Sequence, residues 1–304
     1  MKRLLIVIAA TILTVSAGTF SPAQQTMLQP IGEEAFRTLL TFYQYDSGAP
    51  LDARVVETRK MGGFTREKIV FTGIRDSRVP AYLAVPTNGK GPFPCVVQMH
   101  GYTGNKGEWY VDDSYYSGGK VTKALIAAGY AVFSIDAQYH GERLAFNDYE
   151  TAGTLNNPGH IHRLYDMIVQ TVVEYRRGID YLETRPEIDA NRIGVFGYSM
   201  GGMTAFLLTG CEPRVKTTVA CVAWRIFDPP ESPVAPYNFA KGVDGRPFLM
   251  LMATGDQHYT VEQAKALFEL VDSPVKDLRF FESNHQLPAG QYIPQAAGWF
   301  KEHL

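Results

Sequence analysis

The chain has 304 residues, of which 45% are hydrophobic and 20% are charged, and its formal net charge is −2. This composition is that of an ordinary globular protein and excludes a disordered or fibrous chain. The lysines and arginines are scattered along the sequence and form no basic block, so nucleic acid is not expected as a partner.

The first 23 residues have the three parts of an export signal. Positive charge at the start precedes an apolar run from Leu4 to Val15, and small residues follow up to Ala23. The run is short for a bilayer span, which takes about 20 apolar residues. We therefore expect residues 1–23 to be a signal peptide that directs the protein to the periplasm or the medium. An uncleaved N-terminal anchor is the alternative.

Residues 24–304 are expected to form a single α/β domain. The first predicted elements are a helix over 31–45 and an antiparallel hairpin at a sheet edge, formed by 66–71 and 79–85. Beyond residue 92, short apolar runs alternate with amphipathic segments. These segments predict strands over 93–99, 131–135, 192–196, 215–223, 247–253 and 277–281, and helices over 120–128, 161–182, 203–208, 261–271 and 292–303.

The alternation of strands and helices indicates a mostly parallel, eight-stranded sheet with helices on both faces. The run from Phe93 to Met99 is almost wholly apolar, as expected of a strand that is buried on both faces. Two connections, 103–119 and 225–245, are longer than usual and leave the carboxyl ends of strands, where open α/β sheets bind their ligands. Neither is long enough to form a large lid domain.

Residues 197–201 have the sequence Gly-Tyr-Ser-Met-Gly and lie between a predicted buried strand and a predicted helix. A serine in such a sharp turn has strained backbone angles, so its neighbours must be small, as Gly197 and Gly201 are. The helix N-terminus behind it offers unpaired N–H groups to a negative charge. Ser199 is therefore the expected nucleophile. The alternative is a glycine-rich turn with a solvated serine.

A serine hydroxyl needs a base, and the base needs an acid that orients it. Asp256 follows the predicted strand 247–253, and His285 lies in the loop after the last predicted strand, which is the chain order typical of this turn. We expect a triad of Ser199, His285 and Asp256. Asp228, just past the preceding strand, is the second candidate for the acid, and a solvated loop histidine is the alternative for His285.

An oxyanion hole needs two convergent backbone N–H groups. We expect one from Met200, which follows the nucleophile, and one from Tyr102 in the loop after the strand 93–99. The alternative for this loop is a tight strand exit without a catalytic role. Trp109 and Trp224 follow strand ends and are candidates for substrate contacts, although packing of the loops onto the domain explains them equally well.

These motifs resemble those of the α/β-hydrolase superfamily, and within it the branch of dienelactone hydrolases and acetyl xylan esterases. The resemblance covers nearly all of the chain from about Arg66 onward. It rests on His100-Gly101-Tyr102, on Asp136-Ala137-Gln138-Tyr139-His140-Gly141, on the segment 180–194, on the turn 197–202, on Gly255-Asp256 and on Asn284-His285.

The resemblance implies an α/β-hydrolase fold and hydrolysis of carboxylic esters through an acyl-enzyme, with no cofactor. Two features depart from relatives. Dienelactone hydrolases have a cysteine at the position of Ser199, so cleavage of dienelactones is not expected. The loop that contains Tyr102 also differs from the His-Gly-Gly-Gly loop of other esterases.

Two further residue patterns concern metal binding and disulfide bonds. His160 and His162 have the spacing of a metal-binding pair, but no third ligand is near them, so no metal site is expected. Three cysteines are an odd number, which argues against a disulfide framework. Cys95 is expected inside a buried strand, whereas a bridge between Cys211 and Cys221 stays open.

The sequence therefore predicts a serine hydrolase whose partner is a small-molecule ester with a small or medium acyl group. A peptidase or amidase of the prolyl-peptidase type that uses the same triad is the nearest alternative. A catalytically silent binding protein with a hydrolase fold is the other. The identity of the ester, the oligomeric state and the cleavage site of the signal stay open.

Overall fold

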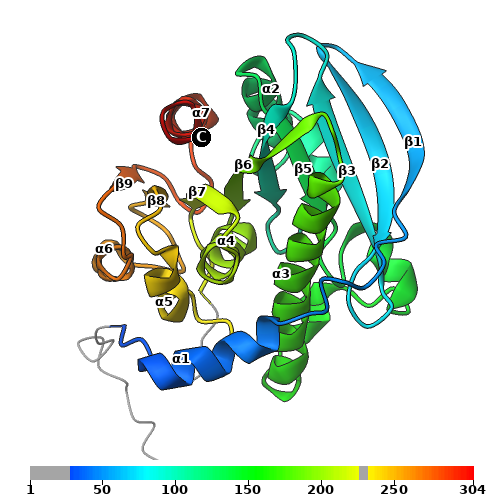
Figure 1. The fold of residues 1–304 in the computed structure, drawn as a ribbon. Coiled ribbons are helices and arrows are strands. Elements are labelled where there is room, and N and C mark those ends of the chain that lie inside the picture. The colour runs from blue at the N-terminus through cyan, green and yellow to red at the C-terminus, as the bar shows by residue number, and fades with distance from the viewer. Residues whose placement is uncertain (1–27, 226–231) are drawn as a thin grey trace, which may run out of the picture.

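The computed structural model describes residues 28–225 and 232–304. Their strands form one nine-stranded sheet in the order β1-β2-β3-β5-β4-β6-β7-β8-β9 (Figure 1). The strands are β1 (Arg54–Met61), β2 (Phe64–Thr72), β3 (Arg78–Pro86), β4 (Phe93–Met99), β5 (Ala131–Ile135), β6 (Ile188–Tyr198), β7 (Val215–Cys221), β8 (Phe248–Ala253) and β9 (Lys276–Phe281).

The pairing confirms the predicted mixed, mostly parallel sheet. β1, β2, β3 and β5 pair antiparallel, and β5, β4, β6, β7, β8 and β9 pair in parallel. The sheet has one strand more than the eight predicted, because β1 extends it beyond the predicted hairpin. All but one of the β1 residues are exposed, so this strand has no apolar face that the sequence could reveal. Its charged residues suit an open edge.

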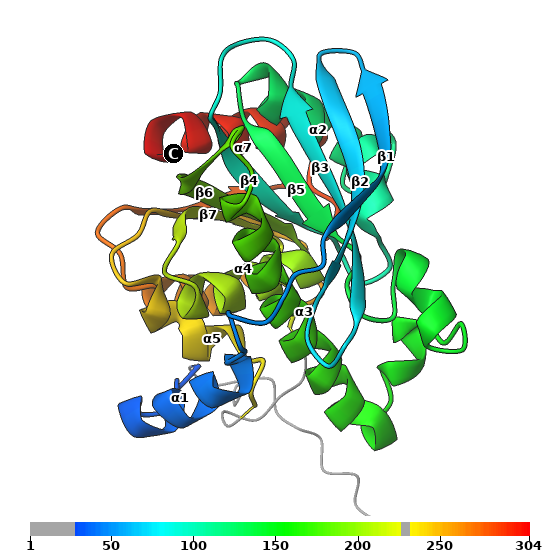
Figure 2. The same ribbon diagram turned by 45° about the vertical axis from the view of Figure 1, so that its right-hand side comes forward.

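Helices cover both faces of the sheet (Figures 1 and 2). The α-helices are α1 (Glu33–Leu40), α2 (Gly118–Ala127), α3 (Ile161–Glu183), α4 (Met200–Cys211), α5 (Pro236–Phe239), α6 (Val261–Glu269) and α7 (Ala289–His303). Short 3-10 helices are η2 (Thr41–Tyr43), η3 (Lys106–Tyr110), η4 (Gly141–Phe146), η5 (Ala152–Leu155), η6 (Pro158–His160) and η7 (Ala240–Val243).

Two hydrophobic cores lie on the two sides of the sheet. α2 and α7 pack on one face, and α3, α4, α5 and α6 pack on the other. Within β4, Cys95 and Val97 belong to the core of α3, whereas Val96 belongs to the core of α2. Because side chains of β4 pack into both cores, the strand has no polar face, and its sequence is a nearly continuous apolar run.

The long helix α3 supplies the largest predicted apolar stripe, and the structure confirms it. Each buried aliphatic side chain contributes about 1.5–3 kcal/mol. The buried residues of the stripe are Leu164, Ile168, Val172, Tyr175, Ile179 and Leu182.

The remaining expectations about the chain have different outcomes. Cys95 is buried as predicted, and Cys211 and Cys221 are free thiols, so no bridge joins them. The predicted signal peptide, residues 1–23, lies outside the described residues. In the segments 28–225 and 232–304, no helix has the length and apolar character needed to cross a membrane.

Candidate active site

The candidate nucleophile lies in a turn between β6 and α4 that only glycines can flank. Ser199 has a φ of 59° and a ψ of −115°. A Cβ on Gly197 would lie 1.9 Å from the carbonyl oxygen of Gly201, and one on Gly201 would lie 1.9 Å from that of Met99. The turn is therefore pressed against both its own helix and the end of β4. The Ser199 N–H donates to the carbonyl of Cys221 at 3.0 Å, which fixes the strained residue.

Three of the predicted residues form one chain of hydrogen bonds. The Oγ of Ser199 lies 2.8 Å from Nε2 of His285, and Nδ1 of His285 lies 2.9 and 3.1 Å from the carboxylate oxygens of Asp256. The Asp256 side chain is fully buried, and one of its oxygens also accepts from the N–H of His258 at 2.8 Å. Because the Nδ1–H group donates a hydrogen bond to Asp256, Nε2 is the nitrogen that can accept the serine proton.

The positions of these residues follow from the topology. Ser199 follows β6, Asp256 follows β8 and His285 follows β9, and these strands run in the same direction. Their carboxyl ends therefore meet at one edge of the sheet, where open α/β sheets bind ligands. The second candidate acid, Asp228, lies outside the described residues.

Tyr198 joins the turn of Ser199 to the loop of His285, a contact that no local sequence pattern predicts. Its hydroxyl donates to the carbonyl of His285 at 3.0 Å and accepts from the N–H of Leu287 at 2.8 Å. Both partners are buried, and the Tyr198 ring packs on the ring of Tyr116 with centroids 5.3 Å apart. Burial is the main cause that raises the pKa of Tyr198, so the hydroxyl stays protonated and keeps its donor role.

The loop after β4 presents the N–H group of Tyr102 in a fixed orientation. The carbonyl of Gly101 accepts from the N–H of Gly104 at 2.9 Å and from Nδ1 of His100 at 2.8 Å. The C=O and N–H of one trans peptide point in opposite directions, so the Tyr102 N–H points away from these donors. Neither it nor the Met200 N–H donates to another of the described residues.

Two histidines hold this loop in place. Nε2 of His100 accepts from the N–H of Ala137 at 3.0 Å, which leaves Nδ1 as its donor nitrogen. Burial, and then the neighbouring His140, lower the pKa of His100 to about 3. The His140 ring lies between the carbonyls of Gln138 and Tyr102, with Nδ1 2.6 Å from the former. Neutral His100 and the clamped His140 therefore fix both peptides that flank Tyr102.

A buried ion pair supports the same region. Nζ of Lys106 lies 2.6 Å from a carboxylate oxygen of Asp136 and 2.6 Å from one of Glu142. The side chains of Lys106 and Asp136 are almost fully buried, and Asp136 also accepts from the backbone N–H groups of Lys106 and Glu142, each at 2.9 Å. These contacts tie the loop after β4 to the loop after β5.

Ser199 and His285 open onto a cavity of about 320 Å³. Of the two candidates for substrate contacts, Trp224 lines this cavity. Trp109 is not among its lining residues: it is fully buried and packs on Tyr116 and Phe196. The lining residues are Gly101, Tyr102, Thr103, Gly104, Glu108, Tyr115, Tyr116, Asn156, Tyr198, Ser199, Trp224, Gln257, His258 and His285.

His258 lies closer to the triad than its sequence position implies. Its ring meets that of His285 edge to face, with centroids 4.7 Å apart. Burial and the proximity of His285 lower the pKa of His258, and Asp256 opposes this in part. Ligand atoms of Asp256, His258 and His285 lie within 4.8 Å of one another, but the hydrogen bonds of Asp256 and His285 already account for their positions.

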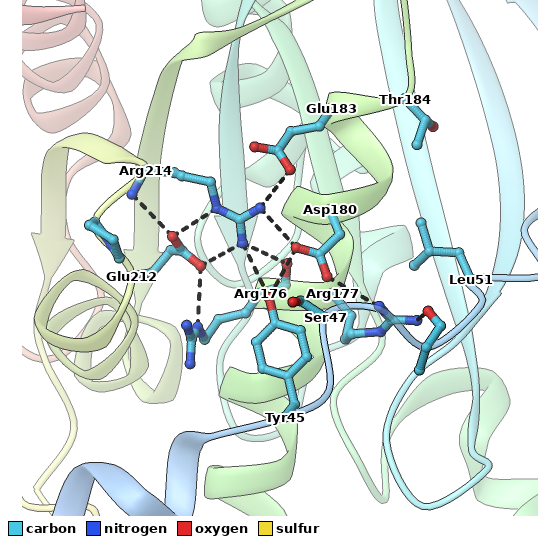
Figure 3. Close-up of a pocket in the computed structure, with 12 residues that line it drawn as sticks. Tyr45, Ser47, Leu51, Arg176, Arg177, Asp180, Glu183, Thr184, Glu212 and Arg214 are labelled. Carbon is cyan, nitrogen blue, oxygen red and sulfur yellow. Dashed lines mark hydrogen bonds and ion pairs between the residues drawn. The ribbon is translucent and has the colours of Figure 1, made fainter.

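A larger cavity, of about 690 Å³, lies near the amino end of β7 and is lined by charged side chains (Figure 3). Arg214 pairs with Glu212 and Asp180, Arg176 pairs with Glu212, and Arg177 pairs with Asp180, at 2.7–3.2 Å. No histidine lines this cavity among the described residues. The ion pairs join α3 to the segment before β7, so we interpret this cavity as structural.

A family model for acetyl xylan esterase (AXE1) matches residues 55–225. This match spans β1 to the end of β7 and includes the loop of Tyr102 and the turn of Ser199. The chain belongs to the AXE1 family. Members of this family are esterases, that is, carboxylic ester hydrolases of the α/β-hydrolase fold, which confirms the branch that the sequence motifs indicated.

Individual relatives agree with this assignment. Esterase YjfP of Escherichia coli (strain K12) is 29% identical over 150 residues, which are 49% of this chain and 53% of YjfP. The 2,6-dihydropseudooxynicotine hydrolase of Paenarthrobacter nicotinovorans is 27% identical over 183 residues, 60% of this chain and 38% of that protein. The chain thus spans about half or less of the length of these relatives.

Solved structures show the same fold. Acetyl xylan esterase 1 from Thermoanaerobacterium sp. JW/SL YS485 aligns with a TM-score of 0.68 and 20% identity, over 91% of this chain and 96% of that one. The acetyl xylan esterase from Paenibacillus sp. R4 aligns with a TM-score of 0.68 and 16% identity, over 92% and 97% of the two chains. At such identities the likeness concerns the fold.

Proposed function

We propose that the protein hydrolyses carboxylic esters with small or medium acyl groups through an acyl-enzyme on Ser199. The observation that carries the proposal is the continuous hydrogen-bonded chain from the Ser199 hydroxyl through His285 to the buried carboxylate of Asp256, at the edge of a 320 Å³ cavity. Membership of an esterase family agrees with it.

In the first half of the proposed reaction, Ser199 forms a bond to the ester carbonyl carbon. Its proton passes to Nε2 of His285, 2.8 Å away, and the buried Asp256 carboxylate stabilises the imidazolium that forms. The tetrahedral intermediate then breaks its bond to the alcohol oxygen. His285 returns the proton to that oxygen, and the alcohol leaves the acylated serine behind.

The second half repeats these steps with water. Nε2 of His285 takes a proton from a water molecule, whose oxygen bonds to the acyl carbon. The intermediate breaks its bond to Ser199 Oγ, which recovers the proton from His285, and the carboxylic acid is released. In both intermediates the N–H groups of Tyr102 and Met200 are the proposed donors to the oxyanion. One such donor contributes about 3–4 kcal/mol of transition-state stabilisation.

The dimensions of the cavity support a small acyl group. A volume of about 320 Å³ is at the lower end of ligand-binding cavities, and it must hold both the acyl and the alcohol part of an ester. The buried Tyr116 and Tyr198 are among the residues that line it. A long acyl chain would have to leave the cavity for solvent.

The test is a comparison of wild type with Ser199→Ala on p-nitrophenyl esters of increasing acyl length. We expect the highest kcat/KM at two to four acyl carbons, and a loss of at least about 10³-fold in kcat for the variant. Ser47→Ala, an exposed serine beside the charged cavity of Figure 3, is the matched control and should keep wild-type rates. Full activity of Ser199→Ala, or faster cleavage of matched anilides than of esters, would refute the proposal.

We further propose that the protein is exported. The support is the short apolar run from Leu4 to Val15, which follows two basic residues and precedes small ones. N-terminal sequencing of protein recovered from the periplasm or the medium should find a chain that begins near Ala23. Recovery of the intact Met1 from the cytoplasm would contradict export.

A further inference from the structure

Three side chains that can bind a metal ion meet beside the candidate nucleophile. A carboxylate oxygen of Asp256 and one ring nitrogen each of His258 and His285 lie within 4.8 Å of one another. The proposed reaction uses Asp256 and His285 but gives no task to the His258 side chain, which lines the same cavity as His285. Two imidazoles and one carboxylate are a ligand set of zinc sites that keep a fourth position open.

The separations of these atoms suit a zinc ion. Tetrahedral ligand atoms at about 2.1 Å from Zn²⁺ lie about 3.4 Å from one another. Nδ1 of His285 and the nearer Asp256 oxygen are 2.9 Å apart, and no pair in the cluster exceeds 4.8 Å, so the observed separations bracket this value. The N–H of His258 donates to Asp256 at 2.8 Å, which keeps the residue beside the carboxylate. A small shift of the half-buried His258 ring therefore brings all three ligands to one ion.

The charges around the cluster favour a cation over an anion. The Asp256 carboxylate is fully buried, and within the described part of the chain His285 is its one ion-pair partner. Glu108 adds a second carboxyl to the cavity, and no lysine or arginine lines it among the described residues. The two nitrogen ligands select the ion, because Ca²⁺ and Mg²⁺ prefer oxygen ligands whereas Zn²⁺ binds imidazole readily.

An ion at this place would remove the base of the proposed reaction. A neutral imidazole carries one proton, and in the triad this proton lies on Nδ1 of His285, which faces Asp256, while Nε2 faces the Ser199 hydroxyl. A metal ion that binds Nδ1 leaves Nε2 as the only nitrogen that can carry the proton. The proton moves from Nδ1 to Nε2 with no net gain or loss, and Nε2 can then no longer accept the proton of Ser199.

We propose that Asp256, His258 and His285 form an inhibitory zinc site. The ion binds the Asp256 carboxylate, Nδ1 of His285 and one ring nitrogen of His258, and its fourth position opens to the cavity. His258 completes the site, because the pair of Asp256 and His285 alone supplies only two ligands. The loss of activity rests on the proposed function, whereas the binding of the ion does not.

The kinetic experiment titrates Zn²⁺ into the hydrolysis of p-nitrophenyl acetate. Micromolar Zn²⁺ should inhibit the wild type, excess EDTA should restore the rate, and Ca²⁺ or Mg²⁺ at the same concentration should have no effect. His258→Phe keeps an aromatic ring and removes both nitrogens, and His258→Gln removes the ring. Each variant is compared with its own rate without Zn²⁺.

The expected effect is a rise of the zinc inhibition constant by at least about tenfold in both variants, because even the outer partners of a metal site contribute about 10- to 100-fold to its affinity. His162→Phe removes an exposed histidine on α3 and is the matched control, which should keep the wild-type inhibition. An active wild type that millimolar Zn²⁺ does not inhibit, or inhibition that is unchanged in both His258 variants, would refute the site and leave the esterase proposal standing. Loss of inhibition in His162→Phe would also refute it.

A binding measurement tests the site without turnover. In calorimetric titration, Ser199→Ala should bind Zn²⁺ at least about tenfold more tightly than the double variant Ser199→Ala/His258→Phe does. Equal dissociation constants would refute the site. Tighter binding by Ser199→Ala would support the site even if the wild type proved to hydrolyse no ester, in which case the proposed function alone would fail.

Discussion

Replacement of Tyr198 by phenylalanine tests how His285, the proposed catalytic base, is positioned. The phenylalanine ring preserves the packing on Tyr116 and removes only the hydroxyl. That hydroxyl makes two hydrogen bonds, of 3.0 Å to the carbonyl of His285 and 2.8 Å from the N–H of Leu287. Because Leu287 is buried, its N–H would be left without a partner in the variant.

The magnitude follows from these two bonds. Each neutral hydrogen bond contributes about 1 kcal/mol, and an unsatisfied buried N–H costs about 1–3 kcal/mol, so the free energy of unfolding should fall by about 2–3 kcal/mol. A displacement of His285 by about 1 Å can lower kcat about 100-fold. We therefore expect Tyr198→Phe to lower kcat on p-nitrophenyl acetate by about 10- to 100-fold, with KM nearly unchanged because the cavity wall is preserved.

The assay is steady-state kinetics beside urea unfolding of the same preparations. The matched control is Tyr45→Phe, which also removes a hydroxyl that donates to a partner on another segment, Asp180, at 3.0 Å. This control lies beside the charged cavity of Figure 3, so it should lose some stability and keep wild-type kcat. Wild-type kcat in Tyr198→Phe, or an equal loss of kcat in Tyr45→Phe, would refute a positioning role for Tyr198.

Two further predictions concern the loops around the oxyanion position. Burial holds the pKa of His100 at about 3 in the folded protein, below the ordinary value of 6.5, so its contribution to stability is present above pH 6.5 and is lost as the pH falls toward 3. Between pH 6.5 and 3, the free energy of unfolding should fall by up to about 1.4 kcal/mol per pH unit because of His100. In urea unfolding, His100→Gln should remove this contribution to the pH dependence. The same pH dependence in His100→Gln and in wild type would contradict the prediction. Lys106→Met leaves the buried carboxylate of Asp136 without its cation. The free energy of unfolding should therefore fall by about 3–5 kcal/mol in the same assay. A loss below about 1 kcal/mol would show that the ion pair does not stabilise the fold.

The parts of the fold that the sequence predicted are those with local signals. β4 and β5 end where their apolar runs end, and the nucleophile turn is encoded within five residues by glycines that no side chain could replace. Asp256 and His285 could be chosen as candidates because chain order and strand ends restrict where an acid and a base can lie, and the structure places both in one hydrogen-bonded chain with Ser199. β1 was missed because an exposed edge strand has no alternation of buried and exposed residues.

The supporting contacts around the triad could not be predicted. The Tyr198 hydroxyl bonds to residues 87 and 89 positions away, and no local pattern encodes such a contact. From the sequence, Trp109 and Trp224 were both candidates for substrate contacts. Only the packing of the folded chain shows that Trp109 is buried in the core and that Trp224 lines the cavity.

The central claim is that the hydroxyl of Ser199 is the nucleophile, activated by His285. Labelling with a fluorophosphonate, followed by peptide mass spectrometry, tests it most directly. We predict one adduct, on the peptide that contains Ser199, with labelling abolished in Ser199→Ala and strongly slowed in His285→Ala. An adduct on a different residue, or no adduct on folded wild-type protein, would contradict the account.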